Sequence, residues 1–591
     1  MHQLKTFLKL FFTGTLFYLS CLSANKINAQ GFLHANGKII VNGKGEKYIL
    51  RGMGIGGWML QEGYMFKLGN LGQQYKIMNK INELVGPEKT AKFYNEWLLN
   101  HTTKTDIDSM AAWGFNSIRL PMHFNLYTLP VDEEPVAGKN TWIEKGFAMT
   151  DSLLKWCSKN KMYLILDLHA TPGGQGNDLP ISDRHPEKPS LWQSDANKEK
   201  MIALWKRLAA RYAKEQWIGG YDIINEPNWG FEDAKDTKGI SEHKNIPLRQ
   251  LMVDITKAIR EVDTKHIIII EGNGFGNNYN GIFPTWDDNL VMSFHKYGNF
   301  NNTGSISRFL DLREKNNIPL WLGESGENSN TWFTEAIGLA EKNDIGWAWW
   351  QSKKMGINNP LEIRQPQDYQ KFLDYATGKT TEKPTEAEAW KILQELLNNL
   401  KIKNNIYHKD VTDAMFRQVH ATGTKPFKKL IIDKINTTID AVDFDMGSQR
   451  IAYYDKDTAR YQYTPGVNTV GNKGGAYRND GVDIQKDKDG YYIFNIEEGE
   501  WLQYTVNIKE KGSYKISFTT ASDNSNGKIS LLSNGNTLFK ALQVPATEGM
   551  QNWKTVSSEE NISLKKGVNT IRILFDNGGF NLRNMVFIKQ N

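Results

Sequence analysis

Two glutamates, Glu226 and Glu324, stand where their side chains could do chemistry together. Each closes a short apolar run, in YDIINEP at 221–227 and in PLWLGESG at 319–326. Two facing carboxyl groups can cleave a glycosidic bond, because a protonated one donates to the leaving oxygen while an ionised one attacks the anomeric carbon. A single glutamate after a strand is usually a solvated loop residue. The prediction therefore rests on the pair.

The two roles require different surroundings, since a nucleophile must stay ionised and an acid must keep its proton. Residues that could supply these surroundings end other apolar runs, namely Arg119, His169, Asn225, His295, Tyr297 and Trp350. Arg119 can supply a cation, Tyr297 a phenolic donor, and Asn225 an amide for a sugar hydroxyl. The two histidines can bind hydroxyls or orient the carboxylates. Trp350 could form a floor for a sugar ring, although the sequence leaves open which tryptophan of 347–350 faces inward.

Short apolar segments must position these side chains, and eight of them alternate with longer helical patterns. They are YILRGMG at 48–54, SIRLPM at 117–122, YLILDLH at 163–169, YDIINEP at 221–227, HIIIIEGN at 266–273, LVMSFHKY at 290–297, PLWLGESG at 319–326 and IGWAWW at 345–350. Nearly continuous apolar character is typical of strands that are buried on both faces. The segments therefore predict a parallel sheet.

Eight strands separated by helices such as 201–215 and 251–262 favour an α/β fold, the (β/α)8 TIM barrel, over residues 31–400. A doubly wound open sheet is the structural alternative. The barrel is preferred because strand after strand ends in a polar residue. In a (β/α)8 barrel, active-site residues gather at the carboxyl ends of the strands.

The pattern changes after the barrel. Residues 401–437 are interpreted as a barrel-closing segment and a linker, and residues 438–591 as an all-β jelly-roll sandwich. In WLQYTVNI at 501–508 the apolar residues recur every second position, and clusters of Gly, Asn and Asp separate several such runs. This alternation is typical of antiparallel strands with one buried face.

The first 30 residues predict a signal peptide, because lysines precede an apolar run and NKINAQG follows as a cleavage region. We therefore expect a secreted protein. Cys21 lies in an imperfect lipoprotein box, which makes a surface lipoprotein the lesser alternative. Cys157 is the one cysteine that cleavage would leave, so no internal disulfide is expected.

The formal net charge of +6 gives no case for a nucleic-acid partner, and we expect a monomer without a transmembrane span.

Four motifs resemble glycoside hydrolase family 5: DLHATPGGQ at 167–175, INEP at 224–227, SFHKY at 293–297 and GES at 323–325. The resemblance implies a retaining (β/α)8 hydrolase with Glu226 as acid/base and Glu324 as nucleophile. It places Arg119, His169, Asn225, His295, Tyr297 and Trp350 around them. The stretch at 50–65 is similar to the opening of the exo-β-1,3-glucanase branch, which implies that Glu62 binds the terminal sugar. Retention further implies carboxyl groups about 5–5.5 Å apart.

The C-terminal part resembles a carbohydrate-binding module of family 6 in GGAYRNDGVDI at 474–484, EGEWLQYTV at 498–506, QNWKTV at 551–556 and NGGFNLRNM at 577–585. The resemblance implies that Tyr477 and Trp553 sandwich a sugar ring while Asn581 binds its hydroxyls. The family often holds a structural calcium. Here Val442 stands where an acid is expected, so calcium is not predicted, although Asp440 and Asp443 could supply oxygen ligands.

No metal or cofactor is expected to be required for the reaction, because the sequence contains no HExxH and no CxxC motif. GMGIGG at 52–57 matches the dinucleotide pattern, but glycines interrupt any helix that would follow it. The sequence thus predicts a β-glycan hydrolase acting on a polysaccharide, with a β-glucan favoured. A β-mannanase, a transglycosylase and a non-catalytic glycan-capture protein remain alternatives. The sugar, its linkage and endo or exo action stay open.

Overall fold

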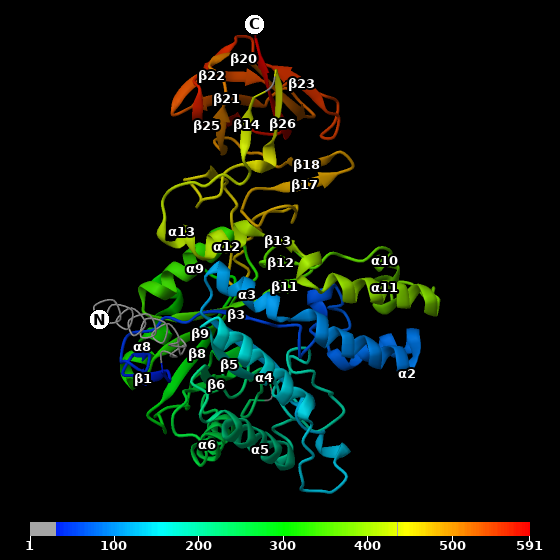
Figure 1. Cartoon of the computed structure of the whole chain (residues 1–591), viewed down its shortest axis with the longest axis vertical. Coiled ribbons are helices and arrows are strands. Elements are labelled where there is room, and N and C mark those ends of the chain that lie inside the picture. Colours follow the sequence, from blue (N-terminus) through cyan, green and yellow to red (C-terminus); the bar gives the residue numbers. More distant parts are fainter. Residues whose placement is uncertain (1–30, 234, 434, 591) are drawn as a thin grey trace, which may run out of the picture.

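A computed structural model describes residues 31–233, 235–433 and 435–590. The expected signal peptide and the lipoprotein cysteine Cys21 lie outside the described residues. Figure 1 shows two bodies, a barrel with its helices below and a β-sandwich above, joined by a narrower waist. Within the described residues, no helix combines the length and the hydrophobicity needed to cross a membrane.

The first body is a closed barrel of eight parallel strands, in the order β10-β3-β4-β5-β6-β7-β8-β9. The strands are β3 (Arg51–Gly54), β4 (Ser117–His123), β5 (Tyr163–Ala170), β6 (Ile218–Asp222), β7 (Ile268–Ile270), β8 (Leu290–Lys296), β9 (Leu320–Gly326) and β10 (Gly346–Trp350). Seven of them match the predicted segments, whereas β6 lies earlier than predicted and shares only residues 221–222 with the segment at 221–227. The closed order of the eight strands confirms the barrel over the open sheet. Every residue of β4, β5, β8 and β9 is buried, as their continuous apolar character predicts.

Helices surround the barrel and separate its strands (Figure 1). The main ones are α2 (Gln74–His101), α3 (Lys104–Trp113), α4 (Glu144–Lys159), α5 (Asp195–Tyr212), α6 (Ile246–Arg260), α8 (Ser307–Asn316) and α9 (Asn330–Lys342), and the short α7 spans Asn273–Gly276. Local sequence sets their ends. A capping box between Thr103 and Asp106 begins α3, and Gly114 in the left-handed conformation ends it.

The second body is a sandwich of two sheets. One runs β14-β19-β25-β21-β22 with β16 beside β19, and the other runs β17-β18-β26-β20-β23 with β15 and β24 beside it. The strands are β14 (Leu430–Ile432), β15 (Asn436–Asp440), β16 (Tyr453–Tyr454), β17 (Ile484–Asp487), β18 (Gly490–Ile493), β19 (Trp501–Ile508), β20 (Gly512–Ala521), β21 (Lys528–Ser533), β22 (Asn536–Gln543), β23 (Lys554–Ser557), β24 (Ile562–Leu564), β25 (Gly567–Asn577) and β26 (Asn581–Lys589). Burial alternates along β19, which confirms the two-residue period.

The segment between the two bodies is folded against both of them. After α10 (Tyr369–Ala376) and α11 (Glu386–Asn399), strand β13 (Ile406–Tyr407) pairs with β12 (Leu361–Glu362), beside β11 (Lys353–Lys354). Helices α12 (Lys409–Met415) and α13 (Arg417–His420) pack on α9. Strand β14 pairs with β19 of the sandwich, so the sandwich begins inside the segment interpreted as a linker. Residues 401–437 were interpreted as a barrel-closing segment and a linker, and strand pairing and helix packing hold most of them in place.

Candidate active site

The predicted site residues meet at the carboxyl ends of the barrel strands. They are placed as follows: Arg119 on β4, His169 on β5, Asn225 and Glu226 just after β6, His295 on β8 with Tyr297 directly after it, Glu324 on β9 and Trp350 at the end of β10. Glu62 follows β3 and precedes a short 3-10 helix at Gly63–Phe66. The barrel thus brings together all nine residues that the sequence placed in one site.

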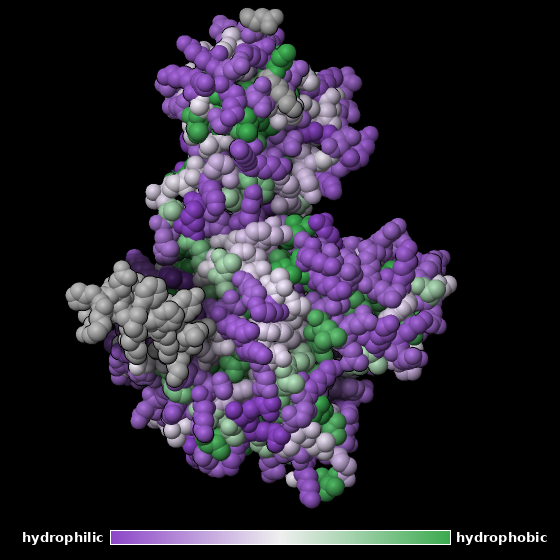
Figure 2. All heavy atoms as spheres, in the orientation of Figure 1, coloured by the Kyte–Doolittle hydropathy of each residue, from purple (hydrophilic) through white to green (hydrophobic). Residues whose placement is uncertain are grey.

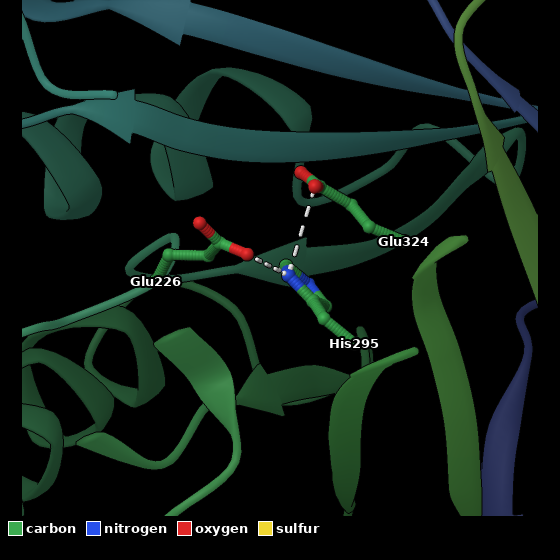
Figure 3. Close-up of side chains that lie close together, drawn as sticks. All are labelled: Glu226, His295 and Glu324. Atoms are coloured by element: carbon green, nitrogen blue, oxygen red, sulfur yellow. Dashed lines mark hydrogen bonds and ion pairs between the residues drawn. The ribbon is translucent and has the colours of Figure 1, made fainter. Parts of the chain in front are cut away.

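Glu226 and Glu324 face each other across the mouth, with His295 between them (Figure 3). The Nδ1 atom of His295 lies 2.7 Å from Glu226 Oε1 and 3.6 Å from Glu324 Oε2. One carboxylate oxygen of Glu226 and one of Glu324 lie within 4.8 Å of each other. This separation leaves room for an anomeric carbon to be attacked directly, and is too small for an intervening water as inverting hydrolysis requires.

Positive charge and donors surround Glu324. Arg119 Nη1 donates to Oε1, and the Tyr297 hydroxyl donates to Oε2 at 3.0 Å. Burial alone would raise the pKa of this carboxyl, but the charges of His295, Arg119 and His169 outweigh it and lower the pKa. Glu324 is therefore held ionised, as a nucleophile must be.

Glu226 has the opposite environment. Burial raises its pKa, the nearby carboxylates Glu324 and Glu271 raise it further, and the hydrogen bond to His295 only partly counteracts them. Its backbone lies in the left-handed region, at φ 43°, and its N–H donates to Glu271 Oε2 at 2.7 Å. A non-glycine residue in this region is strained, which is common at functional sites.

Three buried acids that the sequence reasoning did not assign contact Arg119 or His295 and so help to position the site. Asp222 accepts from Arg119 at 2.8 and 2.9 Å, Asp167 lies 3.2 Å from its guanidinium, and Glu271 lies 3.3 Å from it. Glu271 also lies 3.2 Å from His295 Nε2, and its charge raises the pKa of that histidine well above its ordinary value. A signal for Glu271 was present, because an acid directly follows the isoleucines of HIIIIEGN, much as Glu226 and Glu324 follow apolar runs.

The remaining residues form the walls of the site. Asn225 Oδ1 accepts from Arg119 Nη2 at 2.8 Å, while its amide nitrogen lies 3.2 Å from His169 Nε2. The rings of His169 and Trp350 are stacked, with centroids 5.2 Å apart and planes 3° apart. Trp350 borders the cleft, whereas Trp347 and Trp349 pack in the barrel core. The structure therefore identifies Trp350 as the inward-facing ring.

Glu62 lines the same cleft, whose volume is ≈ 830 Å³. Burial raises its pKa to about 8, and the neighbouring carboxylates Glu324, Glu327 and Glu226 contribute. At neutral pH its carboxyl is mainly protonated and can donate a hydrogen bond as well as accept one. Tyr64 lies beside it in the cleft and accepts from Trp350 Nε1 at 2.8 Å. The sequence reasoning missed Tyr64.

In the sandwich, the three predicted sugar-binding residues do not form one cluster. Tyr477 contacts Tyr491, with ring centroids 4.6 Å apart, whereas Trp553 contacts Tyr492 at 5.2 Å. The two rings thus contact adjacent residues of β18, and adjacent side chains of a strand point to opposite faces. Asn581 donates to the carbonyl of Met550 at 2.6 Å, in the loop that leads to Trp553. The predicted sandwiching of a sugar by Tyr477 and Trp553 stays a prediction, and Tyr492 is the aromatic that the structure adds beside Trp553.

Asp443, one of the two acids considered for calcium, has other partners. Asp443 accepts from the Tyr477 hydroxyl at 2.5 Å and forms an ion pair with Lys428 at 2.9 Å. A lysine ammonium therefore already neutralises the carboxylate that would be needed as an oxygen ligand. These contacts fit a calcium ion poorly.

A parallel barrel whose strand ends carry a proton-bearing acid and an ionised carboxylate is the architecture of a glycosyl hydrolase. Comparison with known families agrees. Residues 79–356 match Cellulase (glycosyl hydrolase family 5), and residues 476–589 match the carbohydrate binding module of family 6. The chain thus joins a glycosyl hydrolase family 5 domain to a family 6 carbohydrate-binding module. Enzymes of this hydrolase family generally need no cofactor.

Over the aligned regions, relatives are about a quarter identical to this chain. A beta-xylosidase of Phanerodontia chrysosporium is 25% identical over 59% of this chain and 77% of its own length. Endoglucanase C of Acetivibrio thermocellus is 24% identical over 46% of this chain and 90% of its own. A probable glucan 1,3-beta-glucosidase A of Aspergillus fumigatus is 25% identical over 43% of this chain and 57% of its own.

Proposed function

We propose that this protein is a secreted, retaining β-glucan hydrolase that acts by double displacement. The observation that carries the proposal is the pair Glu226 and Glu324, whose oxygens lie within 4.8 Å and whose pKa values are shifted in opposite directions. Opposite shifts support Glu226 as the acid and Glu324 as the nucleophile. The names of two relatives, an endoglucanase and a probable glucan 1,3-beta-glucosidase, support glucan as the substrate class.

In the first step Glu324 attacks the anomeric carbon while Glu226 gives its proton to the leaving oxygen. A glycosyl ester on Glu324 results, and the leaving chain departs as an alcohol. In the second step Glu226, now ionised, takes a proton from water, and the resulting hydroxide equivalent displaces Glu324. Arg119 and Tyr297 stabilise the carboxylate that is released, because both donate to it in the resting enzyme.

The experiment is hydrolysis of laminarin, lichenan, cellulose, glucomannan and xylan by the mature protein, followed by proton NMR of the first products. We expect release of sugar from a β-glucan and a β-anomer at the earliest time points. An α-anomer would refute retention. Cleavage of glucomannan or xylan alone would refute glucan specificity, and the xylan arm is needed because one relative is named a beta-xylosidase.

The carbohydrate-binding module is expected to hold the enzyme on the same polysaccharide. We also propose that the module folds without calcium, since Lys428 neutralises Asp443. Thermal unfolding in EDTA and in millimolar calcium tests this, and a rise in the transition temperature with calcium would contradict it.

Export rests on the leader sequence, and N-terminal sequencing of protein from the culture medium tests it. Light scattering tests the proposed monomer.

A further inference from the structure

A loop from the sandwich side of the chain reaches the catalytic cleft. Residues 457–470, the 457–470 loop, lie between β16 and β17 of the sandwich, yet Gln462 and Tyr463 line the same cleft as Glu226 and Glu324. Nothing in the barrel sequence signals this, because the loop follows the last barrel strand by about one hundred residues. The loop therefore needs its own explanation.

Hydrogen bonds join the two ends of the 457–470 loop. The carboxylate of Asp457 accepts from the backbone N–H groups of Val470 and Gly471 at 3.0 Å each, and Arg460 pairs with Val470. Such ends make a compact loop that can present a side chain at a fixed place. Ala459 is fully buried and belongs to the hydrophobic core of the barrel.

The residue Asn328, which follows the barrel strand that carries Glu324, also holds this loop by hydrogen bonds. Just past the end of β9, the amide of Asn328 donates to the Arg460 carbonyl at 2.7 Å and accepts from the Arg460 N–H at 2.9 Å. Asn479 donates to the Asn328 carbonyl at 2.8 Å. The side chains of Asn328 and Asn479 are buried, so breaking these bonds would leave their polar atoms without partners. The loop is therefore positioned by the same strand as the nucleophile.

The tip of the loop lies beside the residue that follows Tyr297. The N–H of Tyr463 donates to the carbonyl of Gly298 at 2.9 Å. Gly298 has φ +47°, and a Cβ there would lie 2.9 Å from Gln462 Cγ, so the close approach requires glycine. The rings of Phe300 and Tyr461 pack with centroids 4.6 Å apart. The backbone of the tip is thus anchored immediately next to the reaction centre.

The side chain of Tyr463, unlike its backbone, is free. It is 66% exposed although it borders the cleft. An aromatic ring that is held by its backbone and left open on its face suits a glycosyl unit, because such a unit has an apolar face and a polar rim. The adjacent Gln462 can bond to sugar hydroxyls through its amide.

We propose that the 457–470 loop forms a substrate-binding subsite of the hydrolase, in which Tyr463 stacks on a glycosyl unit beyond those that contact Glu226 and Glu324. The sandwich side of the chain is then a wall of the active site as well as a separate sugar-binding body. This inference rests on the proposed hydrolase function and adds to it a determinant of chain-length preference.

The test compares wild type, Tyr463→Ala, Tyr463→Phe and the loop control Val470→Ala, whose side chain is exposed and does not border the cleft. Each is assayed on laminarihexaose, cellohexaose and the 4-nitrophenyl β-glucoside and β-cellobioside. For Tyr463→Ala we expect the ratio of kcat/KM for the hexasaccharide to that for the aryl glycoside to fall roughly two- to ten-fold, chiefly through KM, as loss of one aromatic contact predicts. Tyr463→Phe should keep the ratio, and so should Val470→Ala.

The outcomes separate the two ideas. If wild type cleaves none of these glycosides, the proposed function fails. If wild type cleaves them and Tyr463→Ala keeps the wild-type ratio, the subsite is refuted while the hydrolase stands. An equal fall in Tyr463→Ala and Val470→Ala would also refute it, since a general disturbance of the loop would explain the result.

Discussion

Replacing Tyr297 with phenylalanine removes the hydroxyl that donates a hydrogen bond to the nucleophile Glu324 and changes little else. That hydroxyl donates to Glu324 Oε2 at 3.0 Å, and the ring lies against the aromatic and aliphatic cluster beside α2. The substitution preserves the volume of the ring. It therefore isolates the contribution of a single donor to the ionisation of Glu324.

The size of the effect follows from the hydrogen bond. A hydrogen bond to a charged group stabilises by about 1.5–3 kcal/mol, and we take the lower end because water can enter the cleft and replace the hydroxyl. Each pKa unit corresponds to about 1.4 kcal/mol. Loss of the donor disfavours the ionised form, so the pKa of Glu324 should rise by about one unit while Arg119 still holds the carboxylate.

The assay is the pH dependence of kcat/KM on an aryl glycoside between pH 3 and 9. The acidic limb reports ionisation of the nucleophile and the alkaline limb loss of the proton of the acid, as macroscopic values for the coupled pair. For Tyr297→Phe the acidic limb should move up by about one pH unit, and the alkaline limb should move less. Tyr127→Phe is a suitable control, because the Tyr127 hydroxyl is bonded to Thr150, away from both glutamates.

Two results would refute this reasoning. An unmoved acidic limb with activity reduced equally at every pH would mean that the hydroxyl acts on the sugar and not on Glu324. A shift toward lower pH would mean that the tyrosine opposes ionisation, against the geometry.

Three further predictions concern other parts of the molecule. Glu226→Gln should lower kcat on polysaccharide by about 10²–10⁴-fold, and far less on a dinitrophenyl glycoside, whose leaving group needs no proton; equal losses would contradict the acid role. Asp455 has its pKa raised to about 8 by burial and by Glu500, so it takes up a proton on folding and its stability contribution is lost as pH rises from about 4 to 8. Asp455→Asn should therefore raise the free energy of unfolding at pH 8 by up to about 4 kcal/mol more than at pH 5, since each pH unit between the two pKa values corresponds to about 1.4 kcal/mol, and an equal change at both would refute it. Asn479→Ala should lower the free energy of unfolding by about 1–3 kcal/mol, because Asn328 and Asn330 lose a buried partner; calorimetry beside the exposed control Asn536→Ala measures this.

The barrel could be predicted because its signal is local and repeated. Most strands are short, apolar on both faces and followed by a polar residue, and a parallel barrel brings Glu226, His295 and Glu324 to the same end. The ionisation states could not be predicted in the same way. Both glutamates follow similar apolar runs, yet burial raises the pKa of Glu226, whereas the charges of His295 and Arg119, which lie on other strands, lower the pKa of Glu324.

The junction between the two bodies was the least predictable part. The sequence at 401–437 indicated a barrel-closing segment and then a linker, the latter because it contains a stretch rich in Gly, Pro and Lys. The structure instead shows β14 paired with β19 and helix α12 packed on α9. Backbone pairing of this kind depends on partners that are distant in the sequence, and a local pattern does not report them.

The same limit explains why the cleft has a contributor that motif reading did not find. Asn328 and Asn479 are single polar residues without a periodic pattern. Their role is visible only in the folded chain, where Asn479 donates to the carbonyl of Asn328. Together they fix the 457–470 loop to the strand of the nucleophile through buried hydrogen bonds. A flexible tether would raise the local concentration of substrate at any orientation. A docked body fixes one orientation, so a glycan chain bound at Tyr463 would enter the site of Glu324 from one direction.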